Sequence, residues 1–263
     1  MNVATSQAAA DLLLQTLSQG QVIQALPENL RPNDREQGYQ IQQQLERFSD
    51  KPLFGWKIAA TSAAGQAHIG IDGPIAGRVF AETVYQSADA IPFGANRMCV
   101  AEAEFAFKMG QDLPPRDTPY QTDEVLAAVA KLHLAIEIPD SRFEDFVTAG
   151  GPQLIADNAC AYCFILGPQV PESWRALDLA AHQVVGHVNN TTIYQGCGAN
   201  VLGDPRVALT WLVNELSSLG ITLKAGQVVT TGTTTVPMPI KPGDTVVGDF
   251  GILGTVSCSF LPQ

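Results

Sequence analysis

Residues 100–110 read VAEAEFAFKMG and place two acidic side chains inside an apolar run. Its aromatic residues and the glycine that ends it are typical of a β-strand. On a strand, residues two apart point to the same face, so Glu102 and Glu104 would project side by side. Two anions on an inward face repel unless a cation lies between them, and carboxylate oxygens suit a hard divalent ion. A solvent-exposed edge strand is the alternative, because most acidic residues are simply solvated.

A third acidic residue, Glu137, lies in the apolar part of HLAIEIPDSRF, residues 133–143. An uncompensated carboxylate there would be costly or would become protonated, so Glu137 needs a partner. Three strand carboxylates without Cys or His describe an oxygen-only site, suited to Mg²⁺ or Mn²⁺ and poor for Zn²⁺ or copper. Arg142 follows, where its guanidinium would pair with a substrate carboxylate or orient a ligand carboxylate.

Two further segments place polar groups beside apolar ones. Lys57 lies in GWKIAATS, where desolvation would lower its pKa toward a useful acid/base range. A lysine that snorkels from a strand end is the alternative, and for a single lysine the commoner one. In GQVVTTGTTTVP, Gly232 and Thr233 end a strand, and their backbone N–H and hydroxyl groups suit a carboxylate, although an ordinary turn has the same composition.

Outward from these segments, the chain is rich in short β-branched or aromatic runs separated by Gly, Pro, Asn and Asp, from residue 54 to the end. Apolar periodicity and capping residues predict helices over 5–19, 33–49, 122–131 and 205–219. We therefore expect an α+β fold, with a small helical N-terminal segment over residues 1–53 and a β-rich catalytic domain over 54–263.

The charge balance of the 263 residues excludes several classes of partner. With 26 acidic against 15 basic residues, the net charge is −11, and no run of Lys or Arg occurs. Such a surface repels nucleic-acid phosphates and anionic membranes. No apolar stretch approaches the ~20 residues that cross a bilayer, and the N-terminus lacks the features of a signal peptide. We expect a cytoplasmic protein that binds neither nucleic acid nor membrane.

Five cysteines are present, and Cys160 and Cys163 form a C-x-x-C within ACAYCFILG. A redox pair requires this motif at a helix N-terminus, whereas the segment has the composition of a buried strand. No second Cys/His pair stands at zinc spacing. We therefore expect two buried, reduced thiols rather than a redox or zinc site.

The residues above occur in segments that resemble the fumarylacetoacetate hydrolase superfamily, in the branch of 2-oxopent-4-enoate hydratase and 4-oxalocrotonate decarboxylase. The resemblance runs from about Gly55 to the C-terminus. Its seven segments, in order, are GWKIAATS, HIGIDGPIAG, VAEAEFAF, AIEIPDSRFEDF, IADNACAYCFILG, GCGANVLGDPRVALTWLVNELSSLGITLKAGQVVTTGTTT and PIKPGDTVVGDFGILGTVSCSF. Seven segments in the same order identify the chain as a member.

The resemblance implies a mixed β-sandwich roll, at least a dimer, and Mg²⁺ or Mn²⁺ on the three glutamates with Lys57 near the substrate. It also implies a role in aromatic hydrocarbon catabolism and allows association with a partner enzyme of the pathway. Gly232 and Thr233 match carboxylate binders. Asp157 and Asn158 match structural or substrate-adjacent positions.

One segment departs from the hydratase pattern. Where many hydratases read Q-P-D-F-G, residues 73–77 read GPIAG, so Ile75 replaces an acid expected in proton transfer. Decarboxylases of the branch often carry P-I-x-G here. Asp72 and His68 lie a few residues upstream and are the candidates to replace that acid.

Four functions remain open from the sequence. The first is hydration of a 2-hydroxy-alka-2,4-dienoate, a form of a 2-oxo-4-enoate, to a 4-hydroxy-2-oxo acid. The second is decarboxylation of a 2-oxo-enedioate such as 4-oxalocrotonate. Hydrolysis of an acylpyruvate C–C bond is less favoured, because His68 is the first histidine and the N-terminal segment has none. A scaffold without activity is disfavoured by the intact glutamates and Lys57. In each enzymatic case the substrate is a small 2-oxo acid.

Overall fold

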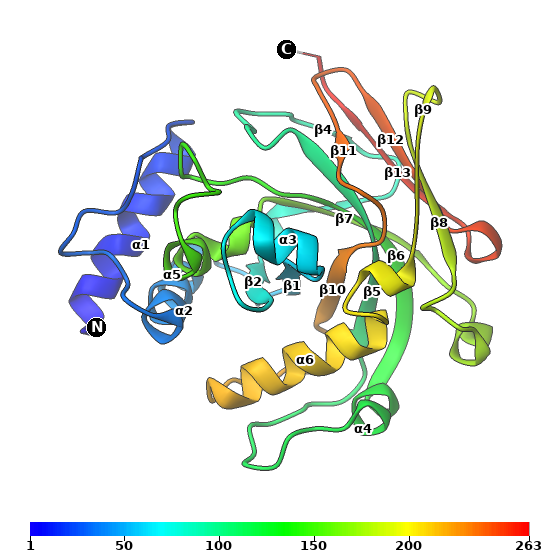
Figure 1. Cartoon of the computed structure of the whole chain (residues 1–263), viewed down its shortest axis with the longest axis horizontal. Helices are drawn as coiled ribbons and strands as arrows, with labels where there is room; N and C mark the ends of the chain where they lie inside the picture. The colour runs from blue at the N-terminus through cyan, green and yellow to red at the C-terminus, as the bar shows by residue number, and fades with distance from the viewer. Residues whose placement is uncertain (263) are drawn as a thin grey trace.

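The computed structural model describes residues 1–262 and has two mixed β-sheets flanked by helices (Figure 1). The larger sheet follows the order β2-β1-β10-β5-β6-β7-β3, with β11 paired to β5, and the smaller one the order β4-β13-β12-β8-β9. The strands are β1 (Gly55–Ala59), β2 (Ile75–Val79), β3 (Val84–Gln86), β4 (Ala90–Ile91), β5 (Val100–Met109), β6 (Val129–Ile138), β7 (Cys163–Gln169), β8 (Gln183–Val188), β9 (Thr192–Cys197), β10 (Val228–Thr233), β11 (Met238–Pro239), β12 (Thr245–Asp249) and β13 (Thr255–Phe260). The α+β class is confirmed.

Alternation along β5 separates the core from the glutamates. Phe105 and Phe107 point into the space between the sheets and are fully buried. Phe105 packs edge-on against Phe250, with ring centroids 5.0 Å apart, and Phe107 packs against Trp174. Residues of opposite parity, among them Glu102 and Glu104, therefore face the other side of the larger sheet.

Six helices lie in the described part of the chain: α1 (Val3–Ser18), α2 (Arg35–Gln44), α3 (Ala63–His68), α4 (Thr122–Ala127), α5 (Gly151–Ala156) and α6 (Pro205–Ser218). α1, α2 and α5 pack together at one side of the larger sheet, opposite the smaller sheet (Figure 1). Leu13 and Ile41 belong to the same buried apolar cluster as Trp56, so the N-terminal helices share the core of the sheets. No helix described is long and apolar enough to cross a membrane.

Helix starts follow the capping residues of the sequence. Asn2 accepts a hydrogen bond from the Thr5 amide, and Asp34 accepts one from the Gln37 amide. The predicted helices over 5–19, 33–49 and 205–219 are confirmed, the second of them finishing as a 3₁₀ turn over Leu45–Phe48. The helix predicted over 122–131 ends earlier, at Ala127. Val129 already pairs with Met109 in the sheet, and this pairing overrides local helix propensity.

Two short helices, α3 and α5, were not predicted, and the strand expected at ACAYCFILG begins late. Asn158, Ala159 and Cys160 form a tight 3₁₀ turn with φ of 57°, 51° and 59°. Cys160 is therefore in this turn, and only Cys163 is in β7. Both thiols are buried and free, as expected.

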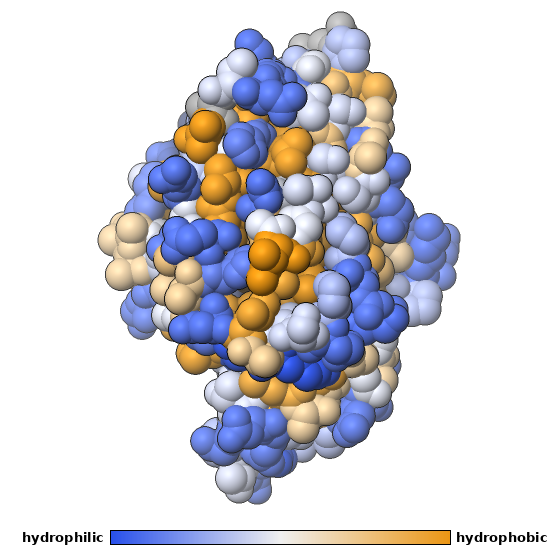
Figure 2. Space-filling view, turned by 90° about the vertical axis from the view of Figure 1, so that its right-hand side faces the viewer, coloured by the Kyte–Doolittle hydropathy of each residue, from blue (hydrophilic) through white to orange (hydrophobic). Residues whose placement is uncertain are grey.

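The outer face of the smaller sheet mixes polar and apolar side chains. Seen from that side, apolar residues form a few small groups between polar ones (Figure 2). Ile193 on β9 and Ile252 are the most exposed of the large apolar side chains near this sheet, at 60% and 81%. Scattered exposure of this kind is ordinary for a protein surface.

Candidate metal centre and substrate cavity

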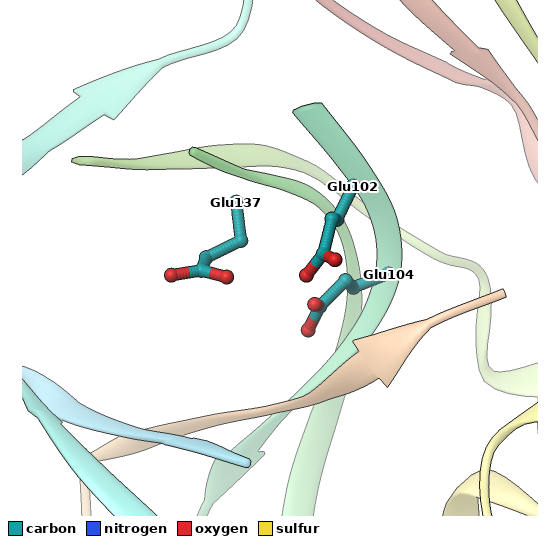
Figure 3. A group of neighbouring side chains, drawn as sticks. All are labelled: Glu102, Glu104 and Glu137. Atoms are coloured by element: carbon teal, nitrogen blue, oxygen red, sulfur yellow. The ribbon is translucent and has the colours of Figure 1, made fainter. Parts of the chain in front are cut away.

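Three glutamates converge on one face of the larger sheet (Figure 3). Glu102 and Glu137 are direct partners across the antiparallel pair β5–β6, and Glu104 follows Glu102 on the same face. One carboxylate oxygen of each lies within 4.8 Å of the others. The expected grouping of the three side chains is therefore present.

The carboxylate oxygens lack the partners that buried anions require. Glu104 and Glu137 are each 1% exposed. Glu104 Oε2 accepts hydrogen bonds from the Thr230 hydroxyl and from the Gly232 amide, the latter at 2.8 Å, but Glu104 Oε1 has no partner within residues 1–262. Both oxygens of Glu137 also lack a hydrogen bond there. Three converging carboxylates, two of them with oxygens that accept no hydrogen bond within residues 1–262, fit a divalent cation such as Mg²⁺ or Mn²⁺.

Burial shifts the acid–base equilibria of these groups. It raises the pKa of Glu104 to about 8, an effect to which the nearby Glu102 adds. Burial also raises the pKa of Glu102, and it raises that of Glu137 well above its ordinary value, while the Lys57 ammonium opposes both shifts. Without a cation, this cluster would hold protons at neutral pH, and a bound dication would displace them.

Lys57, on β1, is 3% exposed, so it does not snorkel to the surface. Its Nζ lies 3.2 Å from Glu137 Oε2 and donates a hydrogen bond to the Ala159 carbonyl at 3.0 Å. Burial alone lowers the pKa of Lys57, as expected from its apolar neighbours, but Glu137 and Glu102 outweigh it. The net shift is upward, so the expected lowering is wrong for this arrangement, and Lys57 is an ammonium beside the carboxylates.

The carbonyl that holds Lys57 belongs to the left-handed turn over Asn158–Cys160. Three consecutive non-glycine residues at positive φ are strained, at ~1–3 kcal/mol each. Asn158 fixes the turn with two buried hydrogen bonds: its Oδ1 accepts from the Arg78 amide at 2.7 Å, and its Nδ2 donates to the Arg78 carbonyl at 2.8 Å. A side chain at Gly77 would collide with the Asn158 carbonyl, since its Cβ would lie 2.3 Å away.

Two residues predicted to bind substrate have structural contacts instead. The amide of Asn158 is used by Arg78. Arg142 is buried and pairs with the carboxylate and carbonyl of Asp157, and its Nη1 donates to the Asp140 carbonyl. Neither Asn158 nor Arg142 lines the 940 Å³ cavity on the Glu102 side, although both line, with Glu137, a smaller one of about 110 Å³. Both brace the loops that carry the Lys57-holding turn.

A cavity of about 940 Å³ opens beside the cluster and is lined by Lys57, Glu102, Gly232, Thr233 and His68. Thr233 donates its hydroxyl hydrogen to the Thr235 carbonyl, so its oxygen is left to accept. His68, at the end of α3, is exposed and packs edge-on against Phe146. Asp72 is exposed and lies outside this lining. It lies close enough to Arg35 for its charge to help raise the pKa of that guanidinium. The structure thus brings His68, but not Asp72, to the cavity.

Thr61 is a cavity residue that the sequence did not single out. It is 5% exposed and lines the cavity. A Cβ at Gly232, whose φ is +105°, would lie 2.2 Å from Thr61 Oγ1, so only glycine fits beneath this hydroxyl. The sequence feature that could have identified Thr61 is its place in GWKIAATS, four residues after Lys57 and just beyond the strand.

Comparison with known proteins shows the family to which the chain belongs. The family model described as fumarylacetoacetate (FAA) hydrolase C-terminal matches residues 31–260. A 2-keto-4-pentenoate hydratase of Paraburkholderia xenovorans (strain LB400) is 31% identical over 255 residues, 96% of this chain and 93% of the relative. A 4-oxalocrotonate decarboxylase of Pseudomonas sp. (strain CF600) is 29% identical, over 85% of this chain and 84% of the relative.

Among solved structures, a 4-oxalocrotonate decarboxylase from Pseudomonas putida G7, complexed with magnesium and adipate, superposes with a TM-score of 0.90. It is 25% identical, and the match covers 99% of both chains. The α+β fold and the family match agree along nearly the whole chain. The chain belongs to the fumarylacetoacetate hydrolase family.

Proposed function

We propose that the protein is a Mg²⁺- or Mn²⁺-dependent hydro-lyase that adds water to a 2-hydroxy-alka-2,4-dienoate and yields a 4-hydroxy-2-oxo acid. The observation that carries the proposal is the polarity of the cavity. Its charged end holds Glu102 and Lys57, and no other Lys or Arg among residues 1–262 lines it. A substrate with one carboxylate, next to its 2-oxygen, matches one charged end.

The chain's own groups have distinct parts in this reaction. Glu102, Glu104 and Glu137 would hold the cation, which when bound draws electron density from the substrate's 2-oxygen. Lys57, fixed by the Ala159 carbonyl and by Glu137, anchors the substrate carboxylate or transfers a proton. Thr61 and Thr233 offer hydroxyl oxygens that can accept a hydrogen bond from the attacking water and so orient it. His68, at the cavity edge, is the candidate for proton exchange with solvent.

Decarboxylation of a 2-oxo-enedioate is the second candidate. It is favoured by Ile75, a fully buried apolar residue where an acid was expected, and by the superposition with a 4-oxalocrotonate decarboxylase. Against it stands the distal carboxylate of such a substrate, for which the cavity offers no Lys or Arg within the described chain. An unpaired carboxylate in apolar surroundings is strongly disfavoured.

The remaining proposals follow from family membership. We expect a homo-oligomer, located in the cytoplasm, that acts on a product of aromatic ring degradation and that associates, if at all, with a partner enzyme of the same pathway. Size-exclusion chromatography with light scattering measures the oligomer.

The activity is tested with purified protein, Mg²⁺, and either 2-hydroxypenta-2,4-dienoate or 2-oxohex-3-enedioate. Loss of dienoate absorbance with formation of 4-hydroxy-2-oxopentanoate supports the hydratase. Release of CO₂ from the diacid without consumption of the dienoate overturns it in favour of the decarboxylase. Glu104→Gln should abolish the activity, whereas Glu28→Gln, at an exposed position, serves as the matched control.

A further inference from the structure

The cavity is larger than a five-carbon dienoate needs. Its volume of about 940 Å³ lies near the upper end of the ~300–1,000 Å³ typical of pockets that enclose drug-sized ligands. Among its lining residues within 1–262, Glu102 and Lys57 are the only ones of the types Asp, Glu, Lys or Arg. Most of the space therefore lies beyond the part of a substrate that carries the carboxylate and the 2-oxygen.

The strand register places the apolar wall directly after the charged end. Glu102 opposes Glu137 across β5 and β6. Val100 lies two residues before Glu102, and Pro139 lies two residues after Glu137, so both lie in the same direction from the carboxylates. Two residues of a strand span ~7 Å and return to the same face. Val100 and Pro139 thus follow the carboxylates by one repeat. Other apolar members of the lining include Ile69, Met98, Phe146, Leu202, Val236 and Pro237.

Charge is almost absent from this apolar part. Apart from Glu102 and Lys57, the lining residues within 1–262 that carry an ionisable side chain are His68 and Cys160. Burial raises the pKa of the Cys160 thiol to about 12, so it stays neutral. A distal anion would have no fixed cation to meet, whereas a hydrocarbon substituent would replace water against apolar walls.

We infer that the substrate carries an uncharged alkyl or aryl substituent of several carbons at the end distal to its 2-oxo acid group. The inference rests on the proposed function for the orientation of the 2-oxo acid end. The tail subsite itself depends only on the cavity, so binding tests it without turnover.

The experiment measures binding of pyruvate, 2-oxopentanoate and 2-oxooctanoate to the Mn²⁺-loaded protein by isothermal titration calorimetry. Because each buried CH₂ strengthens binding by up to roughly fourfold, 2-oxooctanoate should bind at least ~10-fold more tightly than 2-oxopentanoate. Its ω-carboxylated analogue, 2-oxooctanedioate, should bind more weakly than 2-oxooctanoate. Equal affinities along the series, or tighter binding of the diacid, would overturn the inference.

A matched pair of variants locates the subsite. Phe146 is half-buried at the cavity, so Phe146→Ala should reduce the gain from 2-oxopentanoate to 2-oxooctanoate by at least ~3-fold. Ile252→Ala, at an exposed apolar position outside the lining, should leave the series unchanged. If the increase in affinity from 2-oxopentanoate to 2-oxooctanoate is as large in Phe146→Ala as in the wild type, the assignment of the subsite is wrong. Failure of dienoate turnover with an intact binding series would contradict the hydratase and leave the tail subsite standing.

Discussion

Glu102 on β5 and Glu137 on β6 are direct partners across an antiparallel strand pair, with their carboxylates on one face of the sheet. Their positions are set by backbone register and, for Glu137, by the ion pair with Lys57 at 3.2 Å. A change of side-chain charge at Glu102 therefore tests metal binding with little disturbance of the strands, whereas a change at Glu137 also removes the ion-pair partner of Lys57.

Glu102→Gln and Glu137→Gln each remove one anionic ligand and keep the side-chain shape. Affinity for Mn²⁺, measured by calorimetry, should fall by more than the ~10–100-fold typical of losing a group that only orients a ligand. Circular dichroism should show an unchanged fold, and Glu28→Gln should bind Mn²⁺ normally. Wild-type affinity in both variants would rule out the proposed ligands.

Lys57→Met removes the buried ammonium beside Glu137. Turnover should fall by at least ~100-fold, the scale of losing a positioned proton-transfer group. Affinity for Mn²⁺ should not weaken, because no ligand is lost and a neighbouring positive charge is removed. Steady-state kinetics with saturating Mn²⁺ provide the measurement, and normal turnover would exclude Lys57 from the reaction.

The pH dependence of stability should reverse when metal is removed. The pKa of Glu104 rises from 4.5 to about 8 on burial, so between these values the folded protein binds more protons than the unfolded chain. This contribution is present below pH 4.5 and is lost as the pH rises through 8.

The melting temperature in EDTA should therefore decrease from pH 5 to pH 8, by ~2–4 °C per kcal/mol lost in a protein of this size. Added Mn²⁺ should restore it most at pH 8, and Glu104→Gln should flatten the dependence in EDTA. A melting temperature that rises steadily over this range without metal would contradict the buried, protonated cluster.

Asn158 should contribute to the stability of the fold in two ways, through the hydrogen bonds of its side-chain amide and through its tolerance of a left-handed backbone conformation. Asn158→Ala loses two buried hydrogen bonds to Arg78, at ~0.5–1.5 kcal/mol each, and keeps a Cβ at φ 57°. Asn158→Gly loses the same bonds without that steric cost and should be more stable than Asn158→Ala by ~1 kcal/mol. Urea denaturation compares them. Equal midpoints for the two variants would mean that the left-handed conformation carries no cost.

Local periodicity was sufficient to predict the acidic cluster. The spacing of Glu102 and Glu104 fixes their shared face on any strand, and the apolar neighbours of Glu137 require it to have a partner. The apolar runs around the three glutamates also predicted the strands β5 and β6 that carry them. Helices α1 and α6 were equally predictable, because each combines apolar periodicity with a capping residue at its start.

Long-range contacts explain what the sequence did not reveal. Arg142 and Asn158 were predicted as substrate binders, but their partners are Asp157 and Arg78, and only the folded chain brings these together. The left-handed turn at Ala159 contains no glycine to signal it. The upward pKa shift of Lys57 depends on Glu137, a residue on another strand.

The parallel pairing of β1 with β10 has a consequence for biosynthesis. Lys57 stands opposite Thr230, which is synthesised 173 residues later (230 − 57). Before β10 is made, β1 has only β2 as a strand partner within the described chain, and the gap between β1 and β5 is open. Contacts between such distant segments form slowly. The nascent chain therefore lacks the strand that joins its lysine to its glutamates until β10 has been synthesised, and truncation before β10 should yield a chain without a reaction centre.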